Sequence, residues 1–570
     1  MNIIYTNEND CRDCYKCIRN CPVKAISMID HHASIDDKKC IVCGECVHVC
    51  PVGAQKYRND ESKVLELLVS EKKVFLSLAP SFVSDFDILV DDLLEQLYDL
   101  GFEGISETAL GAQLVSYEQK ELLNQSDKSY FSTACPTFVN TILKHYPSLK
   151  QNLPDIYSPL LAHCAMLKKT YGEDIAIVFA GPCFSKKIEA DTHPELLAVA
   201  LTFEELKNLL KNKYLHKKKS NKQNTFIPVQ SSGGAIYPLD GGMIETITDL
   251  IPTSVTNTGY FNFSGIEEII RILESEDFDN QNVFCEFLAC KGGCINGPGI
   301  SNNDLHIISK KEKISRYFKS LPQYSIDDFA KKYHTPINTS YNFCEPVKKD
   351  IYTQDELKKI YKKLGKLTPK DFIDCGACGY NTCEEFAIAC INKQAELTMC
   401  VSSMRKLATD KVKSLMKAIP LGLCIVDNNL KIVECNDMFI KLSVDSDINV
   451  SDSLIMRVVG NSIKKYFEID DSINKVLASK ESTDKIIQHE GRILSINLFI
   501  FGSETLVGII INDITEPAMK KEVVVDKAKK VIKNNLLTIQ KIAYLLGETA
   551  SETEITLNEI IKAYNSNETK

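Results

Sequence analysis

Two cysteine-rich runs near the start of the chain have the spacing of iron–sulfur ligands. Each run reads C-x2-C-x2-C-x3-C-P and ends in a proline directly after its fourth cysteine. In this spacing one loop wraps three corners of a cubane, and the fourth cysteine of each run ligates the other cluster. Zinc also binds C-x2-C pairs, but two full copies with the trailing proline favour two 4Fe–4S clusters. The eight cysteines are Cys11, Cys14, Cys17, Cys21, Cys40, Cys43, Cys46 and Cys50.

A third set of cysteines lies after residue 370 and follows C-x2-C-x4-C-x16-C. The glycines among them allow close backbone approach to a cluster, and residues 384–399 are predicted to form a helix that delivers the last ligand. Cys390 falls on that helix, and we interpret it as a packed thiol. The set resembles another small 4Fe–4S domain, over residues 350–403. Its ligands would be Cys375, Cys378, Cys383 and Cys400.

Four more cysteines stand in three separate segments that contain glycine or proline: STACP, AGPCFSKKIEA and CEFLACKGGCINGPG. Three such segments could bring four thiolates to one point, and four thiolates are what one further cubane needs. These cysteines are Cys135, Cys183, Cys290 and Cys294.

The composition bounds the class of protein that carries these sites. The chain has 570 residues, so more than one domain is expected. Its formal charge of −9 argues against nucleic-acid binding. No basic leader is visible at the start, and no run of about 18 apolar residues occurs, so we expect a cytoplasmic protein without a membrane span. Twenty-two cysteines in a reducing compartment indicate metal binding rather than a disulfide scaffold.

Two parts of the chain resemble known families. Residues 1–58 resemble a bacterial-type ferredoxin with two 4Fe–4S clusters. Residues 70–345 resemble the FeFe-hydrogenases, because the three segments match that family's loops in order: T-S-C-C-P, M-P-C-x-x-K-x-x-E and E-x-M-A-C-x-x-G-C-x-x-G-G-G. The resemblance implies an H-cluster, a cubane joined through one cysteine sulfur to a diiron unit with CO, cyanide and a bridging dithiolate.

The hydrogenase resemblance also implies roles for single residues. The four loop cysteines would hold the cubane, Cys294 would be shared with the diiron unit, and Lys186 would donate to a cyanide ligand. A buried ammonium needs an anionic partner, which agrees with that role. The alternative for Lys186 is an ordinary surface lysine.

Departures from the family pattern bear on activity. Catalytic members have a second cysteine before the first cubane ligand, which carries protons to the dithiolate, and here that position is Ala134. Loss of a positioned proton donor costs about 10² to 10⁴ in rate. The family's loop methionines are replaced by Gly181 and Leu288. Glu118 and Glu121 keep the spacing of the proton-path carboxylates, so the path would lack its last step; their alternative is a solvated helix face.

The sequence changes character after the last cluster motif. Residues 404–419 are predicted to form a connecting helix. The segments CIVD and KIVE flank Asn428–Asn429 as a hairpin, and GRILSINLFIF and ETLVGIIINDIT are two longer strands around Gly502–Ser503. Residues 412–515 resemble a PAS domain, which implies ligand sensing or pairing of two chains.

No residue of this PAS-like segment stands out as a cofactor ligand. Cys424, Cys435 and His489 are interpreted as packing or surface residues. The tail over residues 517–570 has apolar residues at coiled-coil spacing, with Asn535 at a skipped core position, which suits a short parallel coiled coil. An amphipathic helix packed on the same chain is the alternative. The apolar positions are Val525, Ala528, Ile532, Ile539, Ile542 and Leu546.

These features predict a multidomain α+β and α/β protein: a ferredoxin-like domain, an H-cluster domain, a small helical 4Fe–4S domain, a PAS domain and a C-terminal helix. The leading interpretation is a slow sensory FeFe-hydrogenase that acts on H2 and protons. It would pass electrons through three accessory 4Fe–4S clusters and signal to a downstream protein as a homodimer. One alternative is a slow metabolic hydrogenase coupled to ferredoxin. The other is a redox-sensing iron–sulfur protein without the diiron unit.

Overall fold

The computed structural model describes residues 2–211, 225–249, 258–279, 281–300, 306–341, 345–347, 352–443, 452–501, 506–515 and 529–535. The chain divides into two compact units, one ending at Cys400 and the other beginning at Val401. Within the described ranges, no helix is long and apolar enough to cross a membrane.

The first unit begins with a small domain built on two short antiparallel strand pairs. The first and last strands pair, with Ile4 opposite Tyr57, and so bring the two ends of this segment together. The second pair is a hairpin in which Ile26 lies opposite Ile35. Each cysteine run contains one short helix, so the two runs fold alike. The elements are β1 (Ile4–Thr6), α1 (Lys16–Asn20), β2 (Ile26–Ile29), β3 (His32–Ile35), α2 (Glu45–Val49) and β4 (Gln55–Tyr57).

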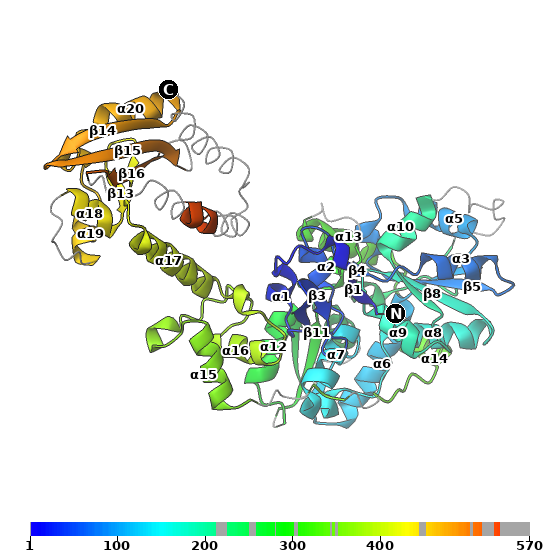
Figure 1. The fold of residues 1–570 in the computed structure, drawn as a ribbon. Coiled ribbons are helices and arrows are strands. Elements are labelled where there is room, and N and C mark those ends of the chain that lie inside the picture. The colour runs from blue at the N-terminus through cyan, green and yellow to red at the C-terminus, as the bar shows by residue number, and fades with distance from the viewer. Residues whose placement is uncertain are drawn as a thin grey trace. The chain divides into compact units, whose positions relative to one another are not determined.

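Two parallel sheets form the centre of the first unit (Figure 1). One has the strand order β6-β5-β8-β9 and the other the order β10-β11-β7. Five of these strands, β5, β6, β8, β9 and β11, are buried along their whole length, as expected when helices cover both faces of a parallel sheet. The strands are β5 (Val74–Leu78), β6 (Gly104–Glu107), β7 (Tyr130–Phe131), β8 (Ala176–Gly181), β9 (Val199–Thr202), β10 (Gly259–Ser264) and β11 (Val283–Leu288).

Helices connect these strands and supply most of the remaining core. They are α3 (Glu61–Val69), α4 (Phe82–Asp85), α5 (Val90–Leu100), α6 (Ala109–Gln125), α7 (Pro136–His145), α8 (Pro159–Tyr171), α9 (Lys186–Thr192), α10 (Phe203–Lys211), α11 (Gly242–Thr248), α12 (Ile266–Ser275), α13 (Ile307–Ser320) and α14 (Ile326–Lys332).

The last part of the first unit carries α15 (Gln354–Lys363) and α16 (Cys383–Ile391), which pack together. The prediction of one helix over residues 384–399 is wrong, because α16 ends early. Lys393 adopts a left-handed φ of 58°, and the Gln394 and Ala395 N–H groups both donate to the Ala389 carbonyl. These bonds satisfy a backbone carbonyl at the C-terminus of α16 and so end the helix. Cys400 is therefore delivered by a separate short 3-10 turn.

The second unit begins with α17 (Val401–Ala418), close to the predicted connecting helix, and continues into a five-stranded antiparallel sheet (Figure 1). The strand order is β13-β12-β16-β15-β14, so the predicted hairpin lies at one edge. Helices α18 to α20 supply the rest of a core that includes Phe439 and Phe467. The elements are β12 (Gly422–Asp427), β13 (Ile432–Cys435), α18 (Asp437–Ser443), α19 (Asp452–Val458), α20 (Asp470–Ser479), β14 (Thr483–His489), β15 (Arg492–Phe501) and β16 (Leu506–Asp513).

Only residues 529–535 of the predicted C-terminal tail are described, and they are helical. Ile532 and Asn535 are half-buried within that stretch. The other predicted core positions of the coiled coil lie outside the described residues, so the coiled coil stays a prediction.

Candidate iron–sulfur centres

Three of the four loop cysteines lie in the loops that follow parallel strands. Cys135 comes after β7 and caps the N-terminus of α7, with Pro136 at the first helical position, where its missing N–H leaves no bond unmade. Cys183 follows β8 and Cys290 follows β11, each two residues after the strand ends. Cys294 opens a 3-10 turn in the same loop as Cys290. The carboxyl ends of parallel strands are where such sheets present their sites.

Electrostatic contacts show that these four side chains lie together. Burial, and after it Cys135, raise the pKa of Cys183 to about 11. Burial also raises the pKa of Cys290, with Cys183, Cys294 and Cys135 adding to the shift. The pKa of Cys294 is raised by burial and then by Cys135 and Cys183. Thiols held this close in a largely buried site suit a positively charged metal cluster, which binds the thiolate form.

Glycines let the loop backbones touch around this site. Gly293 has a φ of 97°, and a side chain there would place its Cβ 2.3 Å from the carbonyl oxygen of Pro238. At Gly297 a Cβ would lie 2.4 Å from the carbonyl oxygen of Pro182. Both positions therefore exclude any larger residue while the loops stay packed.

Lys186 is a buried cation at the edge of the four cysteines. Its ammonium donates to both carboxylate oxygens of Glu189, at 2.9 and 3.0 Å, and to the Ser158 hydroxyl at 3.1 Å. The same charge lowers the pKa of Cys183 and Cys294 against the effect of burial. The alternative of an ordinary surface lysine is wrong, because this residue is 9% exposed.

Glu286 is a buried acid beside the site that the sequence reasoning missed. One of its carboxylate oxygens accepts a hydrogen bond from the Ile244 N–H at 3.1 Å, and the other, Oε1, has no partner among the described residues. Burial raises the pKa of this carboxyl to about 7, and its charge acts on Cys294. It also raises the pKa of Tyr237, whose hydroxyl shares a hydrogen bond of 2.7 Å with Ser116. The sequence signal was one acidic residue inside the apolar strand VFCEFL.

The structure places the predicted proton-path residues on two elements. Ala134 is half-buried next to Cys135. Glu118 and Glu121 are half-buried on α6, and burial raises the pKa of Glu118, with Glu121 adding to it. Between them, Gln119 is 1% exposed and its Nε2 has no partner among the described residues. The inward side of α6 thus presents an amide, and the role of the two glutamates stays a prediction.

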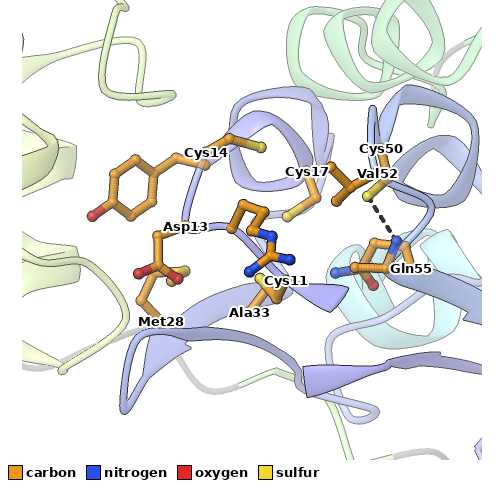
Figure 2. Close-up of a pocket in the computed structure, with 12 residues that line it drawn as sticks. Cys11, Asp13, Cys14, Cys17, Met28, Ala33, Cys50, Val52 and Gln55 are labelled. Carbon is orange, nitrogen blue, oxygen red and sulfur yellow. Dashed lines mark hydrogen bonds between the residues drawn. The ribbon is translucent and has the colours of Figure 1, made fainter. Parts of the chain in front are cut away.

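The cysteines of the two N-terminal runs separate into two mixed groups. Cys11, Cys14, Cys17 and Cys50 line one pocket, and Figure 2 shows Cys50 of the second run facing the first run. The Ala54 N–H donates to the Cys50 sulfur at 3.2 Å. In the other group, burial raises the pKa of three cysteines of the second run, and Cys21 of the first run adds to each shift. These three are Cys40, Cys43 and Cys46. The exchange of fourth cysteines is the arrangement expected for two cubanes.

The Cys21 group borders the four loop cysteines. Cys43 raises the pKa of Cys290. The Ser185 hydroxyl donates to the Val42 carbonyl at 2.8 Å. At Gly44, with a φ of 83°, a Cβ would lie 2.5 Å from the Pro298 ring, so the two loops are in direct contact.

The third set also lies near Cys21. Burial raises the pKa of Cys378, and Cys400 and Cys375 add to it. Cys390 is half-buried and lies near Cys378 and Cys400, which raise its pKa after burial. The Cys383 N–H donates to Asp374 at 2.6 Å. Tyr380 lies between the groups, since its pKa is raised by burial and by charges that include Cys378 and Cys21.

A buried ion cluster ties the ferredoxin-like segment to the sheets. The Lys187 ammonium is 1% exposed and donates to Asp60 at 2.9 Å, to Glu205 at 2.9 and 3.0 Å, and to the Ala200 carbonyl at 3.0 Å. Lys63, which is half exposed, also contacts Asp60, at 2.7 Å. Asp60 follows β4, so this cluster fixes the end of the ferredoxin-like segment.

Comparison with known proteins agrees with these groups. Residues 72–298 match the family described as iron only hydrogenase large subunit, C-terminal domain, residues 10–54 a 4Fe-4S dicluster domain, and residues 373–402 a putative Fe-S cluster. Iron hydrogenase 1 of Clostridium pasteurianum is 24% identical, over 42% of this chain and 53% of that protein. The periplasmic Fe hydrogenase large subunit of Nitratidesulfovibrio vulgaris is 24% identical, over 36% of this chain and 61% of that protein. The chain thus spans little more than half of these relatives.

Solved structures were also matched, with low TM-scores. An FeFe-hydrogenase variant from Chlamydomonas reinhardtii is 17% identical and matches 51% of this chain and 100% of that one, with a TM-score of 0.38. The PAS domain of nitrogen regulation protein NR(II) from Vibrio parahaemolyticus is 17% identical and matches 18% of this chain and 97% of that one, with a TM-score of 0.15. The matched families and the two curated relatives thus support a hydrogenase-like iron–sulfur protein, in which residues 72–298 are similar to the C-terminal domain of the iron only hydrogenase large subunit.

Proposed function

We propose that this protein is a sensory FeFe-hydrogenase that interconverts H2 with two protons and two electrons at low turnover. The observation that carries the proposal is the meeting of Cys135, Cys183, Cys290 and Cys294 at the carboxyl ends of buried strands. Four converging thiols of this kind suit the cubane of an H-cluster. When bound, the attached diiron unit supplies the metal at which hydrogen is split.

The residues around the cysteines would position and protonate this site. The Lys186 ammonium uses its three N–H donors on Glu189 and Ser158, and it would serve an anionic ligand such as cyanide by exchanging one of these bonds for that ligand. Glu286 is buried beside Cys294 with one free carboxylate oxygen, so we propose that it holds or moves a proton there. Ala134 cannot transfer a proton, and this supports slow turnover.

The arrangement of the accessory groups supports a route for electrons. The Cys21 group touches the four loop cysteines through Cys43, and it is flanked by the third set through Tyr380. Electrons from hydrogen would therefore pass first to the cluster held with Cys21. From there they would reach the other two 4Fe–4S clusters or a ferredoxin-type partner.

The sensory part of the proposal rests on the second unit. We propose that residues 412–515 are a PAS domain that pairs two chains and acts on a downstream protein. Its five-stranded antiparallel sheet with helices supports this assignment. The helix α17 begins at the residue after Cys400, so the last predicted ligand of the third cluster and the second unit are covalently continuous.

Infrared spectroscopy of the matured full-length protein tests the proposal. Bands from bound CO and cyanide that change under H2 are the expected result. A sample with its 4Fe–4S clusters in place and the diiron unit supplied, but without such bands, would instead identify a redox-sensing protein that lacks the diiron unit. Turnover with reduced ferredoxin as fast as that of a metabolic hydrogenase would contradict the sensory assignment.

A further inference from the structure

Two cysteines outside all the iron–sulfur groups lie directly opposite each other in the second unit. Cys424 on β12 is paired in register with Cys435 on β13. Opposed residues of an antiparallel pair project to the same face of the sheet, and both belong to the buried core, at 1% and 5% exposure. Burial raises the pKa of Cys424, and Cys435 adds to the shift, which agrees with the register.

The type of strand pairing brings these side chains into the range of a disulfide. The Asn436 N–H donates to the Leu423 carbonyl at 3.0 Å, so the neighbouring residues form the hydrogen-bonded pair. Cys424 and Cys435 are therefore a non-hydrogen-bonded pair, in which the Cα atoms are about 4.5 Å apart and the side chains are closest. Disulfides span Cα separations of about 4.4 to 6.8 Å, so a bond needs little backbone movement.

We propose that Cys424 and Cys435 form a reversible dithiol–disulfide site. The oxidant is a low-molecular-weight disulfide, RSSR, and the reaction is Cys424-SH + Cys435-SH + RSSR → Cys424-S–S-Cys435 + 2 RSH. One S–S bond breaks and one forms, two cysteine sulfurs are oxidised, and the two sulfurs of RSSR leave as thiols with the two protons. In a reducing compartment such bonds are transient and regulatory.

The structure assigns an order to the two thiols. Cys435 is the last residue of β13, a four-residue strand at the edge of the sheet, so local opening of the edge exposes it first. Burial raises the pKa of Cys435 to about 11. Burial raises the pKa of the more deeply buried Cys424 above that of Cys435. The Cys435 thiolate therefore attacks RSSR and releases the first thiol. Cys424 then attacks the Cys435 sulfur and releases the second.

The site is placed to act on the start of the second unit. Asn436, the next residue, uses its side-chain oxygen to accept from the Leu423 and Phe439 N–H groups at 2.8 and 2.9 Å. Its amide donates to the carbonyls of Met416 and Leu421 at 3.1 and 2.8 Å. One side chain thus joins the end of α17, the start of β12 and the start of α18. A covalent link at Cys435 constrains the backbone that carries this junction.

Peptide mapping of the folded full-length protein tests the inference. Trypsin cleaves after Lys431, so Cys424 falls in the peptide of residues 418–431 and Cys435 in that of residues 432–441, with one cysteine in each. The protein is incubated anaerobically with oxidised glutathione, quenched in acid, alkylated in denaturant and digested. We expect a covalently linked pair of these peptides, which dithiothreitol converts back to two separately alkylated peptides.

Single variants separate this site from chance oxidation. Cys424→Ser should abolish the linked pair and leave a glutathione adduct on Cys435, because the resolving thiol is gone. Cys285→Ser removes a buried strand cysteine of the first unit and should leave the linked pair unchanged. The inference fails if folded wild-type protein gives neither linked peptide nor adduct, or if the Cys435 adduct accumulates in wild type. The assay contains no hydrogen, so its outcome is independent of the proposed hydrogenase activity.

Discussion

Restoring a cysteine before Cys135 is the most direct test of why turnover should be slow. Ala134 is half-buried, and the chain on both sides is held: before it, the Thr133 hydroxyl donates to the Ile156 carbonyl at 3.1 Å, and after it, the Cys135 carbonyl accepts from the Val139 N–H at 3.1 Å. Ala134→Cys therefore adds one sulfur atom at a fixed position beside the first ligand. A thiol there can carry a proton, which the alanine methyl cannot.

Two opposing magnitudes set the expected gain. A positioned proton donor contributes about 10² to 10⁴ in rate, or about 3 to 5 kcal/mol of barrier. Fitting one extra heavy atom at a half-buried position costs about 1 kcal/mol in strain, which removes about a factor of five. The proton donor outweighs the strain, so we expect hydrogen evolution to rise at least about twentyfold.

The assay is hydrogen evolution from a reduced mediator, normalised to H-cluster content by infrared spectroscopy. Ala134→Ser is the matched control, because its hydroxyl is similar in size but far less acidic, and it should gain less than about tenfold. Equal loading with no rise in Ala134→Cys would refute the reasoning, since the missing relay would then not be what limits turnover. An equal rise in both variants would point to packing instead of proton transfer.

Three further predictions concern other described groups. Glu286→Gln keeps an acceptor for the Ile244 N–H but removes the acidic proton, so H2 oxidation and evolution should both fall at least about tenfold with the infrared bands retained. Glu268→Gln, on an exposed helix face, is the control. Unchanged activity in Glu286→Gln would exclude Glu286 as a proton carrier. Lys187→Met removes the ion pair of the buried Glu205, while Asp60 keeps Arg58 and Lys63, so it should destabilise the first unit by about 3 to 5 kcal/mol. Lys63→Met, half exposed against the same Asp60, should cost less than about 1 kcal/mol. Thermal unfolding monitored by cluster absorbance compares the two variants, and equal effects would contradict the burial argument. Oxidation of Cys424 and Cys435 closes a loop of about 12 residues and should stabilise the second unit by about 3 kcal/mol. Slower proteolysis of the second unit after oxidation checks this. In the Cys435→Ser variant, oxidation should leave the rate of proteolysis unchanged.

Ligand spacing made much of this site readable from the sequence. The close cysteine runs and the three loops carry their chemistry in residue type and spacing, so their grouping follows from the requirements of a cubane. The hairpin at Asn428–Asn429 was also predictable, because these turn residues stand between two apolar segments. The two strands that they connect pair with each other as expected.

Other features depend on tertiary contacts that spacing does not encode. Glu286 looks like one charge in an apolar strand, and only its burial beside Cys294 makes it a candidate acid. The predicted helix over 384–399 failed because the left-handed Lys393 ends α16, and lysine carries no such preference in sequence. Cys424 and Cys435 were interpreted as packing residues, and they are buried, but their exact opposition depends on the register of β12 and β13.

The geometry of α17 has a consequence for signalling. Residues 405–414, in the middle of this helix, are all exposed, while its end is bonded to Asn436. An α-helix turns about 100° per residue, so one inserted residue in this stretch would rotate everything after it by that angle, whereas seven would nearly restore the original phase. No core packing of the described residues opposes either insertion there. In the proposed sensor, angular phase rather than length is then the quantity by which this helix would act, and insertions of one and of seven residues would distinguish phase from length.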